Sequence, residues 1–320
     1  MRKLVNIFLF SLIFLLSIVI AIMSIQLYNI EEGQLPNPTS EPTITLASTI
    51  APTFTPVPTE VPTATPIPEP EYLEIHHISI GCADAFMLRT KSTTIMIDGG
   101  LAKTKNRVIN YLRDAGVEHI DAYIGTHNHT DHVENINEIL ELFGTSETIV
   151  FGPTPELFKK YQPLSNGKYV QMLDGNEYTV GDIHLFCVGP TNLVQNGNCN
   201  NDSLNFVVQL GKVKALFTGD YMRKDVIEKY PDLLKGIDIF KFPHHGLKNF
   251  SMKASSFKWL SPKYVLVPSN NGGTVKSWGK ELGMPKFECF SSSGGKHHVL
   301  VIKNDCVTVY DDVNPAEFAD

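Results

Sequence analysis

The pattern of hydrophobic and polar positions divides the chain into three parts. The first is an uncharged apolar run from Leu4 to about Tyr28, which Arg2 and Lys3 precede. This run is long enough to span a bilayer as a helix, and by the positive-inside rule the basic residues would stay in the cytoplasm. Residues 1–30 are therefore predicted to anchor a single-pass protein whose remaining chain is extracellular. The alternative is a cleaved signal peptide and a secreted protein, although the run is long for one.

The second part lacks the apolar positions that a folded core needs. Residues 31–71 contain about half of the chain's 20 prolines, many threonines and few large apolar residues. Proline at this density favours an extended polyproline conformation or a tether without preferred length. We predict a disordered Pro/Thr-rich stalk that holds the following domain away from the membrane.

The third part, residues 72–320, alternates between strand-like and helical patterns. The runs "EYLEIHHISIG", "TTIMIDGG", "HIDAYIG", "IDIFKFP" and "KYVLVPS" are apolar or β-branched and end at glycine, proline or polar residues, as strands do. "TKNRVINYLRDAG" has helical spacing, with Thr104 as its N-cap and Gly116 as its stop. "VENINEILELFG" and "MRKDVIEKYPDLLKG" are also predicted helices, and "NFVVQLGKVKALFTGD" predicts a hairpin. Strands that alternate with helices indicate a layered α/β fold.

Charge and cysteine content limit the classes of partner and site. The formal net charge is -7, so no global positive field attracts nucleic acid. A local track such as Lys241, Lys248 and Lys253 would have to compensate. The five cysteines lack the paired short spacings of a thiolate zinc site. We expect them to be buried and unpaired.

A histidine-rich motif follows the predicted strand "HIDAYIG", at the kind of position where sites in α/β sheets gather. The motif "THNHTDH" contains His127, His129, Asp131 and His132. The first two histidines are two residues apart, so their rings can converge on one ion, and Asp131 and His132 can serve a second ion about 4 Å away. Imidazole and carboxylate together suit zinc, and less often manganese or iron. The alternative is a solvated polar loop.

Two later motifs offer further ligands at strand ends. Asp220 ends "LFTGD" and could bridge two metals, and His244 and His245 lie in "FPHHG". Each motif is weak alone, because an aspartate after a strand is more often a helix cap. Together with the histidine-rich motif, and with Asp98 after "TTIMI", they converge on one site.

The order "IDGG", "THNHTDH", "FTGD", "PHHG" resembles the metallo-β-lactamase fold superfamily. Within it, the likeness is to the extracellular metallo-hydrolase domain of ComEC-type competence proteins, to which "NNDSLNFVVQLGKVKALFTGD" and "FKFPHHGLKNFS" are similar. The likeness covers most of residues 73–310. It implies a four-layer αββα sandwich over residues 72–320, preceded by the transmembrane helix and the stalk.

The resemblance also implies two zinc ions per domain, with manganese or iron as alternatives. The implied metal ligands are His127 and His129 on the first ion, Asp131, His132 and His245 on the second, with His244 as the alternative to His245, and Asp220 between the ions. The implied supporting residues are Asp84, Asp98, Asn200, Asn201 and Ser203. Asp98 would orient the histidine loop, and Asp84 could cap the edge of the site as readily as take part in chemistry.

The chain departs from its relatives between the histidine motif and Asp220. Many of them supply another histidine there, whereas this chain has "NCNNDSL". Asn200, Asn201 and Ser203 would line the site or hold a water, and the first metal is expected to bind weakly. His184 lies inside a strand-like run and is interpreted as structural.

The function implied is that of a phosphodiesterase or nuclease, in which two metals lower the pKa of a shared water for in-line attack. Asp131 and Asp220 would be the catalytic carboxylates. His297 and His298 are candidates for protonating the leaving oxygen, although their place in or beside a strand favours a structural role. The substrate would be DNA or a cell-wall polymer, and no protein partner can be inferred. The alternatives are an esterase for cell-surface phosphodiesters, as in phosphorylcholine esterases of the superfamily, or a surface binding module with a degenerate site.

Overall fold

The computed structural model of the chain describes residues 69–155, 166–195 and 199–319. The predicted anchor and most of the predicted stalk lie outside these residues. Among the helices that are described, none combines the length and the apolar character needed to cross a membrane.

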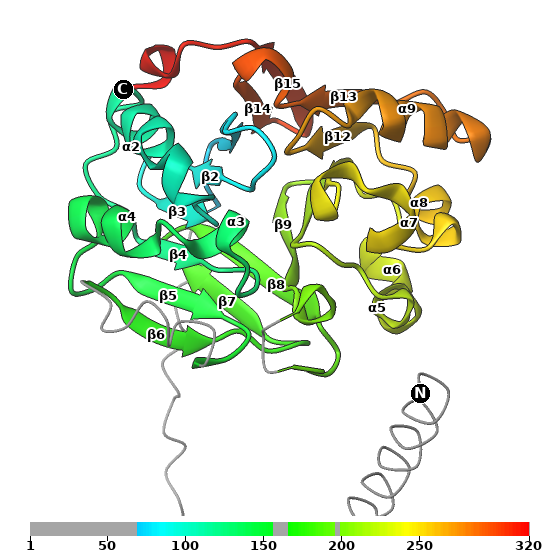
Figure 1. Cartoon of the computed structure of the whole chain (residues 1–320), viewed down its shortest axis with the longest axis horizontal. Helices are drawn as coiled ribbons and strands as arrows, with labels where there is room; N and C mark the ends of the chain where they lie inside the picture. Colours follow the sequence, from blue (N-terminus) through cyan, green and yellow to red (C-terminus); the bar gives the residue numbers. More distant parts are fainter. Residues whose placement is uncertain (1–68, 156–165, 196–198, 320) are drawn as a thin grey trace, which may run out of the picture. The chain divides into compact units, whose positions relative to one another are not determined.

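Two β-sheets form the centre of the described part (Figure 1). The first has the strand order β15-β14-β1-β2-β3-β4-β5-β6, and the second the order β13-β12-β11-β10-β9-β8-β7. The strands of the first sheet are β1 (Leu73–His77), β2 (Phe86–Arg89), β3 (Thr94–Ile97), β4 (Ala122–Ile124), β5 (Ile149–Gly152), β6 (Lys168–Gln171), β14 (His298–Lys303) and β15 (Cys306–Asp311). Those of the second are β7 (Glu177–Val180), β8 (Ile183–Gly189), β9 (Asn205–Leu210), β10 (Val213–Thr218), β11 (Ile239–Lys241), β12 (Tyr264–Val267) and β13 (Glu288–Ser291).

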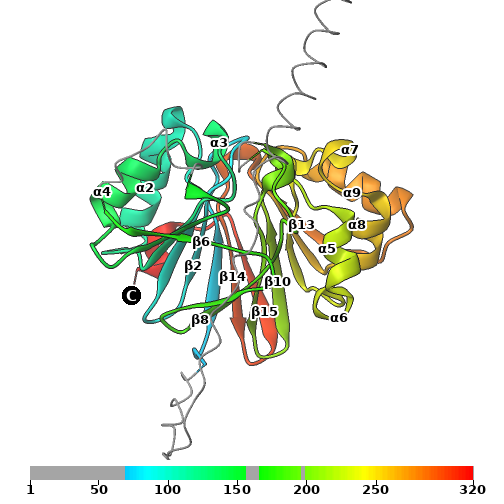
Figure 2. The ribbon, with the colours of Figure 1, turned by 90° about the horizontal axis from the view of Figure 1, so that it is seen from below.

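Helices cover the outer faces of both sheets (Figure 2). On the first sheet lie α2 (Lys105–Asp114), α3 (Thr130–Val133) and α4 (Ile136–Phe143). On the second lie α5 (Lys224–Lys229), α6 (Pro231–Leu234), α7 (Lys248–Ser251), α8 (Ala254–Leu260) and α9 (Gly272–Glu281). Short 3-10 turns are η1 (Ala102–Thr104), η3 (Asn200–Asp202), η4 (His244–Gly246), η5 (Ser293–Gly295) and η6 (Pro315–Phe318).

Apolar side chains fill the spaces between these layers. Between the sheets, the rings of Phe206 and Phe217 stack with centroids 5.4 Å apart, within a cluster drawn from both sheets. A second cluster joins α2 and α4 to the first sheet, and a third joins α5, α8 and α9 to the second. Burial of this apolar surface is the main stabilising contribution to such a fold. The predicted two-sheet α/β architecture is therefore confirmed, with a helical layer on each side.

Two predicted helices differ from the observed ones, each for a local reason. Of the run "VENINEILELFG", which begins at Val133, Ile136–Phe143 forms α4, and the short helix α3 (Thr130–Val133), which was not predicted, ends before it. The helix does not run on from α3, because the carbonyl of His132 accepts the N–H groups of Gly99 and Gly100, at 2.6 and 3.0 Å. In "MRKDVIEKYPDLLKG" the break falls at Tyr230, which has φ -123° and ψ 52°. The cause is Pro231, because proline disfavours helical geometry at the preceding residue.

The predicted ends of α2 differ in their outcome. Gly116 stops the helix as expected, with φ +69° and with Ala319 so near that a Cβ would meet its backbone at 3.1 Å. Thr104 precedes the helix but does not cap it, since its hydroxyl donates to the carbonyl of Leu101 at 2.7 Å. The hydroxyl thus closes the preceding 3-10 turn.

All five cysteines are free thiols, as expected. The expected burial is wrong for most of them: only Cys187 is buried, whereas Cys82 and Cys306 are exposed. The chain therefore gains no cross-link from its cysteines.

Candidate metal centre

Strand ends from both sheets meet at one edge of the sandwich. In the first sheet β3 runs parallel to β4, and in the second β10 runs parallel to β11. The residues after each strand therefore emerge on the same side. Asp98, the histidine-rich loop, Asp220 and the histidine pair are brought together in this way.

One group of possible ligands consists of His127, His129 and Asp220, whose ligand atoms all lie within 4.8 Å of one another. Nε2 of His127 lies 3.1 Å from Nδ1 of His129 and 3.8 Å from Oδ2 of Asp220. This first group is the set that was predicted for the first metal.

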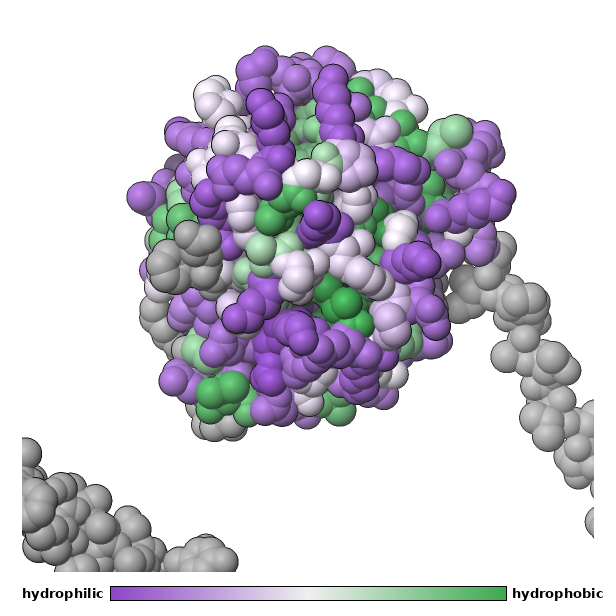
Figure 3. Space-filling model, turned by 90° about the vertical axis from the view of Figure 1, so that its right-hand side faces the viewer, coloured by the Kyte–Doolittle hydropathy of each residue, from purple (hydrophilic) through white to green (hydrophobic). Residues whose placement is uncertain are grey.

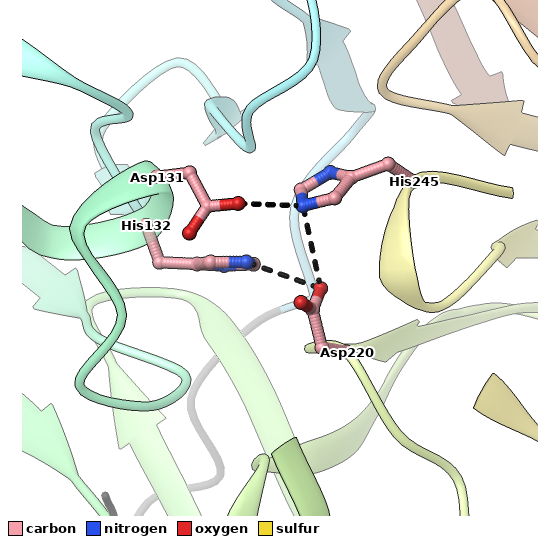
Figure 4. Close-up of side chains that lie close together, drawn as sticks. All are labelled: Asp131, His132, Asp220 and His245. Atoms are coloured by element: carbon pink, nitrogen blue, oxygen red, sulfur yellow. Dashed lines mark hydrogen bonds and ion pairs between the residues drawn. The ribbon is translucent and has the colours of Figure 1, made fainter. Parts of the chain in front are cut away.

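A second group consists of Asp131, His132, Asp220 and His245 (Figure 4). Nε2 of His132 lies 3.1 Å from Oδ1 of Asp220. Nε2 of His245 lies 3.0 Å from Oδ2 of Asp131 and 3.7 Å from Oδ1 of Asp220. Asp220 thus turns one carboxylate oxygen to each group, and its geometry is that of a bridge.

The two neighbouring histidines face different groups. His245 is 3% exposed and contacts the second group. Nε2 of His244 lies 3.7 Å from Oδ2 of Asp220, the oxygen that faces the first group, and 3.4 Å from the side-chain nitrogen of Asn200. His244 is therefore placed beside the first group and does not compete with His245 for the second.

Carboxylates stand behind both imidazoles of the second group. Nδ1 of His132 contacts Oδ2 of Asp98 at 2.8 Å, and Nδ1 of His245 lies 3.0 Å from Oδ1 of Asp84. In each ring this leaves Nε2 facing Asp220. A carboxylate on the far nitrogen fixes the orientation of a ligating histidine and raises its basicity.

The loop itself is fixed by the carboxylate of Asp98. That carboxylate accepts the backbone N–H of Thr126 at 2.9 Å and its hydroxyl at 2.8 Å. The same hydroxyl lies 3.2 Å from Nδ1 of His127. Nδ1 of His127 therefore contacts a hydroxyl, whereas Nδ1 of His132 contacts a carboxylate.

A buried lysine belongs to the site and was not predicted there. Nζ of Lys241 forms an ion pair with Asp84, both side chains being at most 2% exposed, and donates to the carbonyl of Gly219 at 2.7 Å. The proposed nucleic-acid track of Lys241, Lys248 and Lys253 is therefore wrong. A single lysine inside the apolar run "IFKFP" is the signal that could have indicated a buried carboxylate partner.

The backbone is in the left-handed region at three of these positions. Asp98, His244 and His245 have φ of 53°, 50° and 51°, a conformation that costs side-chain-bearing residues free energy and recurs at functional sites. Gly246 follows with φ +85°, and a Cβ there would lie 2.8 Å from that of Asn271 and 2.9 Å from Val267. Glycine is required here because nothing larger fits.

Charges within the second group set its proton affinity. Burial alone would lower the pKa of His132, but the carboxylates of Asp220 and Asp84 raise it well above its ordinary value. Burial likewise opposes the charge on His245, whereas Asp84 and Asp131 raise its pKa to about 9. Without metal these rings hold protons at neutral pH, which a cation would displace.

The pKa values of the histidines near the first group are shifted downward instead. Burial, and then the charge of His132, lower the pKa of His127 well below its ordinary value. Burial also lowers the pKa of His244. Both rings are therefore neutral at neutral pH, the state in which imidazole donates a lone pair to a metal.

The donor set fits a metal. Nε2 of His132 and Oδ1 of Asp220 are buried 3.1 Å apart, yet neither atom makes a hydrogen bond of good geometry among the described residues. Buried polar atoms are rarely left in this state. Converging imidazole nitrogens and carboxylate oxygens are the ligands that zinc takes in proteins.

The other predicted residues have mixed outcomes. Ser203 lies under the site, where its hydroxyl accepts the backbone N–H of Asp220 at 2.9 Å. Asn200 contacts His244, as stated above, whereas Asn201 is exposed and lines a cleft beside Arg223. His184 is exposed and pairs with Glu177 at 3.3 Å, apart from the site.

The candidates for protonating a leaving group are held elsewhere. Nδ1 of His297 accepts the backbone N–H of Ser79 at 3.0 Å. The ring of His298 contacts the carbonyl of Ser291 at 2.9 Å and the carboxylate of Asp311 at 2.8 Å. These contacts favour the structural role for both rings.

Comparison with known proteins identifies one family and several solved structures of similar fold. The family described as Metallo-beta-lactamase superfamily matches residues 83–270. The metallo-beta-lactamase fold protein YhfI from Bacillus subtilis matches with a TM-score of 0.50 and 14% identity, over 68% of this chain and 96% of that one. A diphosphatase from the PhnP family matches with a TM-score of 0.45 and 12% identity, over 68% and 94%. No curated protein matches the sequence. At 14% identity, the match to YhfI indicates likeness in fold alone.

Proposed function

The chain belongs to the metallo-β-lactamase superfamily, and we propose that it is a two-metal phosphodiesterase that acts as a nuclease outside the cytoplasm. The observation that carries the proposal is the position of Asp220, whose two carboxylate oxygens face two separate groups of ligand atoms. A shared carboxylate of this kind is what a pair of adjacent metal ions needs.

The residues that would hold the metals follow from the two groups. His127, His129 and Asp220 would hold the first ion, and the second group would hold the other. When bound, the pair would supply a water of lowered pKa and a positive field for the phosphoryl oxygens. Zinc suits these ligands, and manganese or iron are alternatives.

The chain's own side chains position and charge the site. The pKa of Asp131 is lowered against the effect of burial by His245 and His132. This carboxylate is therefore ionised at neutral pH, and its contact with Nε2 of His245 holds that ring in the second group. Asp84 and Asp98 keep Nδ1 of the two imidazoles occupied, so that each Nε2 stays turned toward Asp220.

Phosphodiester chemistry is favoured by the sequence resemblance to ComEC-type domains. The segment "NCNNDSL" places Asn200, in contact with His244, where other relatives supply a histidine. We propose that the difference serves a substrate other than a β-lactam. The predicted anchor would place the domain at the outer face of the cell membrane, where extracellular DNA is accessible.

The proposal is tested by hydrolysis assays on the full chain purified in mild detergent, with zinc or manganese. We expect release of p-nitrophenol from bis-p-nitrophenyl phosphate and cleavage of single-stranded DNA, both abolished by EDTA. Cleavage of teichoic acid alone would favour the cell-surface esterase. A chain that binds no metal and cleaves neither diester would show the binding module to be correct.

The two metal sites are expected to differ in affinity. The imidazoles of the second group are backed by carboxylates, whereas His127 is backed by a hydroxyl, and outer contacts of this kind change metal affinity by about 10- to 100-fold. We therefore expect two binding events in a cobalt titration followed by absorption, and the weaker event belongs to the first group.

His244 is expected to support the weaker event. Its Nε2 lies near Asp220 on the side of the first group, so His244→Ala should weaken that event by about tenfold or more and leave the tighter one unchanged. His184→Ala is the matched control, because that ring is exposed and lies apart from the site. Loss of the tighter event in the His244 variant would contradict this assignment.

A further inference from the structure

A cleft of about 750 Å³ lies beside β13, the edge strand of the second sheet. Residues of α9, the α9–β13 loop, β13 and the β13–β14 turn line it, together with His298 of β14 and Asp311 at the end of β15. The site described above uses none of these residues. Figure 3 faces the side of the molecule that carries α9, where hydrophilic side chains surround smaller hydrophobic patches.

Four lysines line the cleft, namely Lys276, Lys280, Lys286 and Lys296. All four are exposed, and Lys296 pairs with Asp312 at 3.2 Å. The other three make no ion pair among the residues that the structure describes. The cleft also contains the carboxylates of Glu288 and Asp311, so lysines outnumber them in a chain whose net charge is -7. Such a local excess of positive charge complements a polyanion.

The floor between the lysines is apolar and partly aromatic. Phe287 is half-buried and Phe290 is 9% exposed, and Met284 and Pro285 lie beside them. Aromatic side chains between cations are typical of sites that bind single-stranded nucleic acid, because bases stack on the rings while phosphates meet the lysines. A polyglycerol phosphate has no group that would use this floor.

One end of the cleft lies near the candidate metal centre. β11, β12 and β13 are parallel neighbours, so Ser291 at the end of β13 lies at the same edge as the histidine pair after β11. Two strand spacings separate them, or about 10 Å. A single strand of nucleic acid held in the cleft would therefore reach the candidate metal centre.

The thiol in the cleft does not suggest a second reaction. Burial raises the pKa of Cys289 to about 12, so the sulfur carries no negative charge at neutral pH and is a poor nucleophile. The cleft is suited to binding.

We propose that this cleft binds single-stranded nucleic acid as an extension of the candidate metal centre. The inference rests on the proposed nuclease function for its biological purpose, but binding itself needs no metal. It is therefore testable in EDTA, where hydrolysis does not contribute.

The test measures binding of a fluorescein-labelled 20-nucleotide oligodeoxythymidine to the full chain by anisotropy, over a range of salt concentrations. We expect the variant with Lys276→Gln, Lys280→Gln and Lys286→Gln to bind about tenfold more weakly or worse. The slope of log K against log salt should fall in magnitude by about 2, because each phosphate contact in a single strand contributes about 0.7.

The matched control replaces three exposed lysines elsewhere, Lys91, Lys103 and Lys235, with glutamine. This variant has the same net charge and should bind within about twofold of the unaltered chain, since no phosphate contact is lost. Equal losses in the two variants would show a diffuse charge effect and overturn the proposal.

Two further probes separate bases from phosphates. An abasic oligonucleotide and polyglycerol phosphate both keep the charge, and we expect each to bind more weakly than oligodeoxythymidine. Equal affinity for either one would overturn the assignment to nucleic acid. Hydrolysis of bis-p-nitrophenyl phosphate with metal should be unchanged in the cleft variant. If the unaltered chain did not hydrolyse this diester, the proposed function would be rejected, but the measured binding of oligodeoxythymidine would still support the proposed cleft.

Discussion

Replacing Asp220 with asparagine is expected to remove metal from both groups and to lower phosphodiester hydrolysis by about a thousandfold or more, since such metals supply several kcal/mol of transition-state stabilisation. The physical reason is that Oδ1 faces Nε2 of His132 while Oδ2 faces Nε2 of His127, at 3.1 and 3.8 Å. Asparagine has the same shape but carries no charge and offers one oxygen. The measurements are metal content after dialysis and kcat/KM with bis-p-nitrophenyl phosphate.

The control for this variant is Asp232→Asn, which removes a carboxylate from an exposed position in α6 and should leave metal content and hydrolysis unchanged. Thermal unfolding in EDTA distinguishes a lost site from a lost fold. An Asp220 variant that keeps two ions per chain, or hydrolyses the diester within about tenfold of the unaltered chain, would contradict the bridging role.

The layered fold could be predicted from the sequence because its strands and helices carry distinct periodicities. The runs that form β1, β3 and β10 are bounded by glycine or polar residues, and their burial in the folded chain follows the pattern. The boundaries of the helices were harder to predict from the sequence. The break after α3 depends on the amides of Gly99 and Gly100, which lie more than 30 positions before it and meet it only in the folded chain.

The candidate site could be predicted as far as its residues lie in short motifs at strand ends. The separate positions of His244 and His245 could not, because they depend on a turn through two left-handed residues, which the sequence does not reveal at a pair of histidines. The position of Lys241 was predicted wrongly for a related reason. A charged side chain is expected at the surface, and the buried carboxylate that pairs with Lys241, that of Asp84, is known only from the fold.

Replacing Lys241 with methionine is expected to lower the free energy of unfolding by about 3–5 kcal/mol, the usual cost of removing one partner of a buried ion pair. Asp84 is 1% exposed, and without the ammonium group its charge stays buried with only the imidazoles of His245 and His132 near it. Methionine is unbranched and one atom shorter than lysine, so the loss is mainly that of the charge and of the hydrogen bond to the carbonyl of Gly219. Urea denaturation at pH 7 in EDTA measures the change without a contribution from bound metal.

The matched variant is Lys263→Met, which breaks an ion pair between Lys263 and Asp238 at 2.7 Å. That lysine side chain is 73% exposed, so its pair is screened by water and its removal should cost less than about 1 kcal/mol. The contrast isolates burial, because each change removes one ammonium group and one carboxylate contact. If the two variants lost equal stability, Lys241 would be no more than another surface cation. A larger loss at Lys241 would mean that the buried ion pair stabilises the fold at Asp84, the carboxylate that contacts Nδ1 of His245.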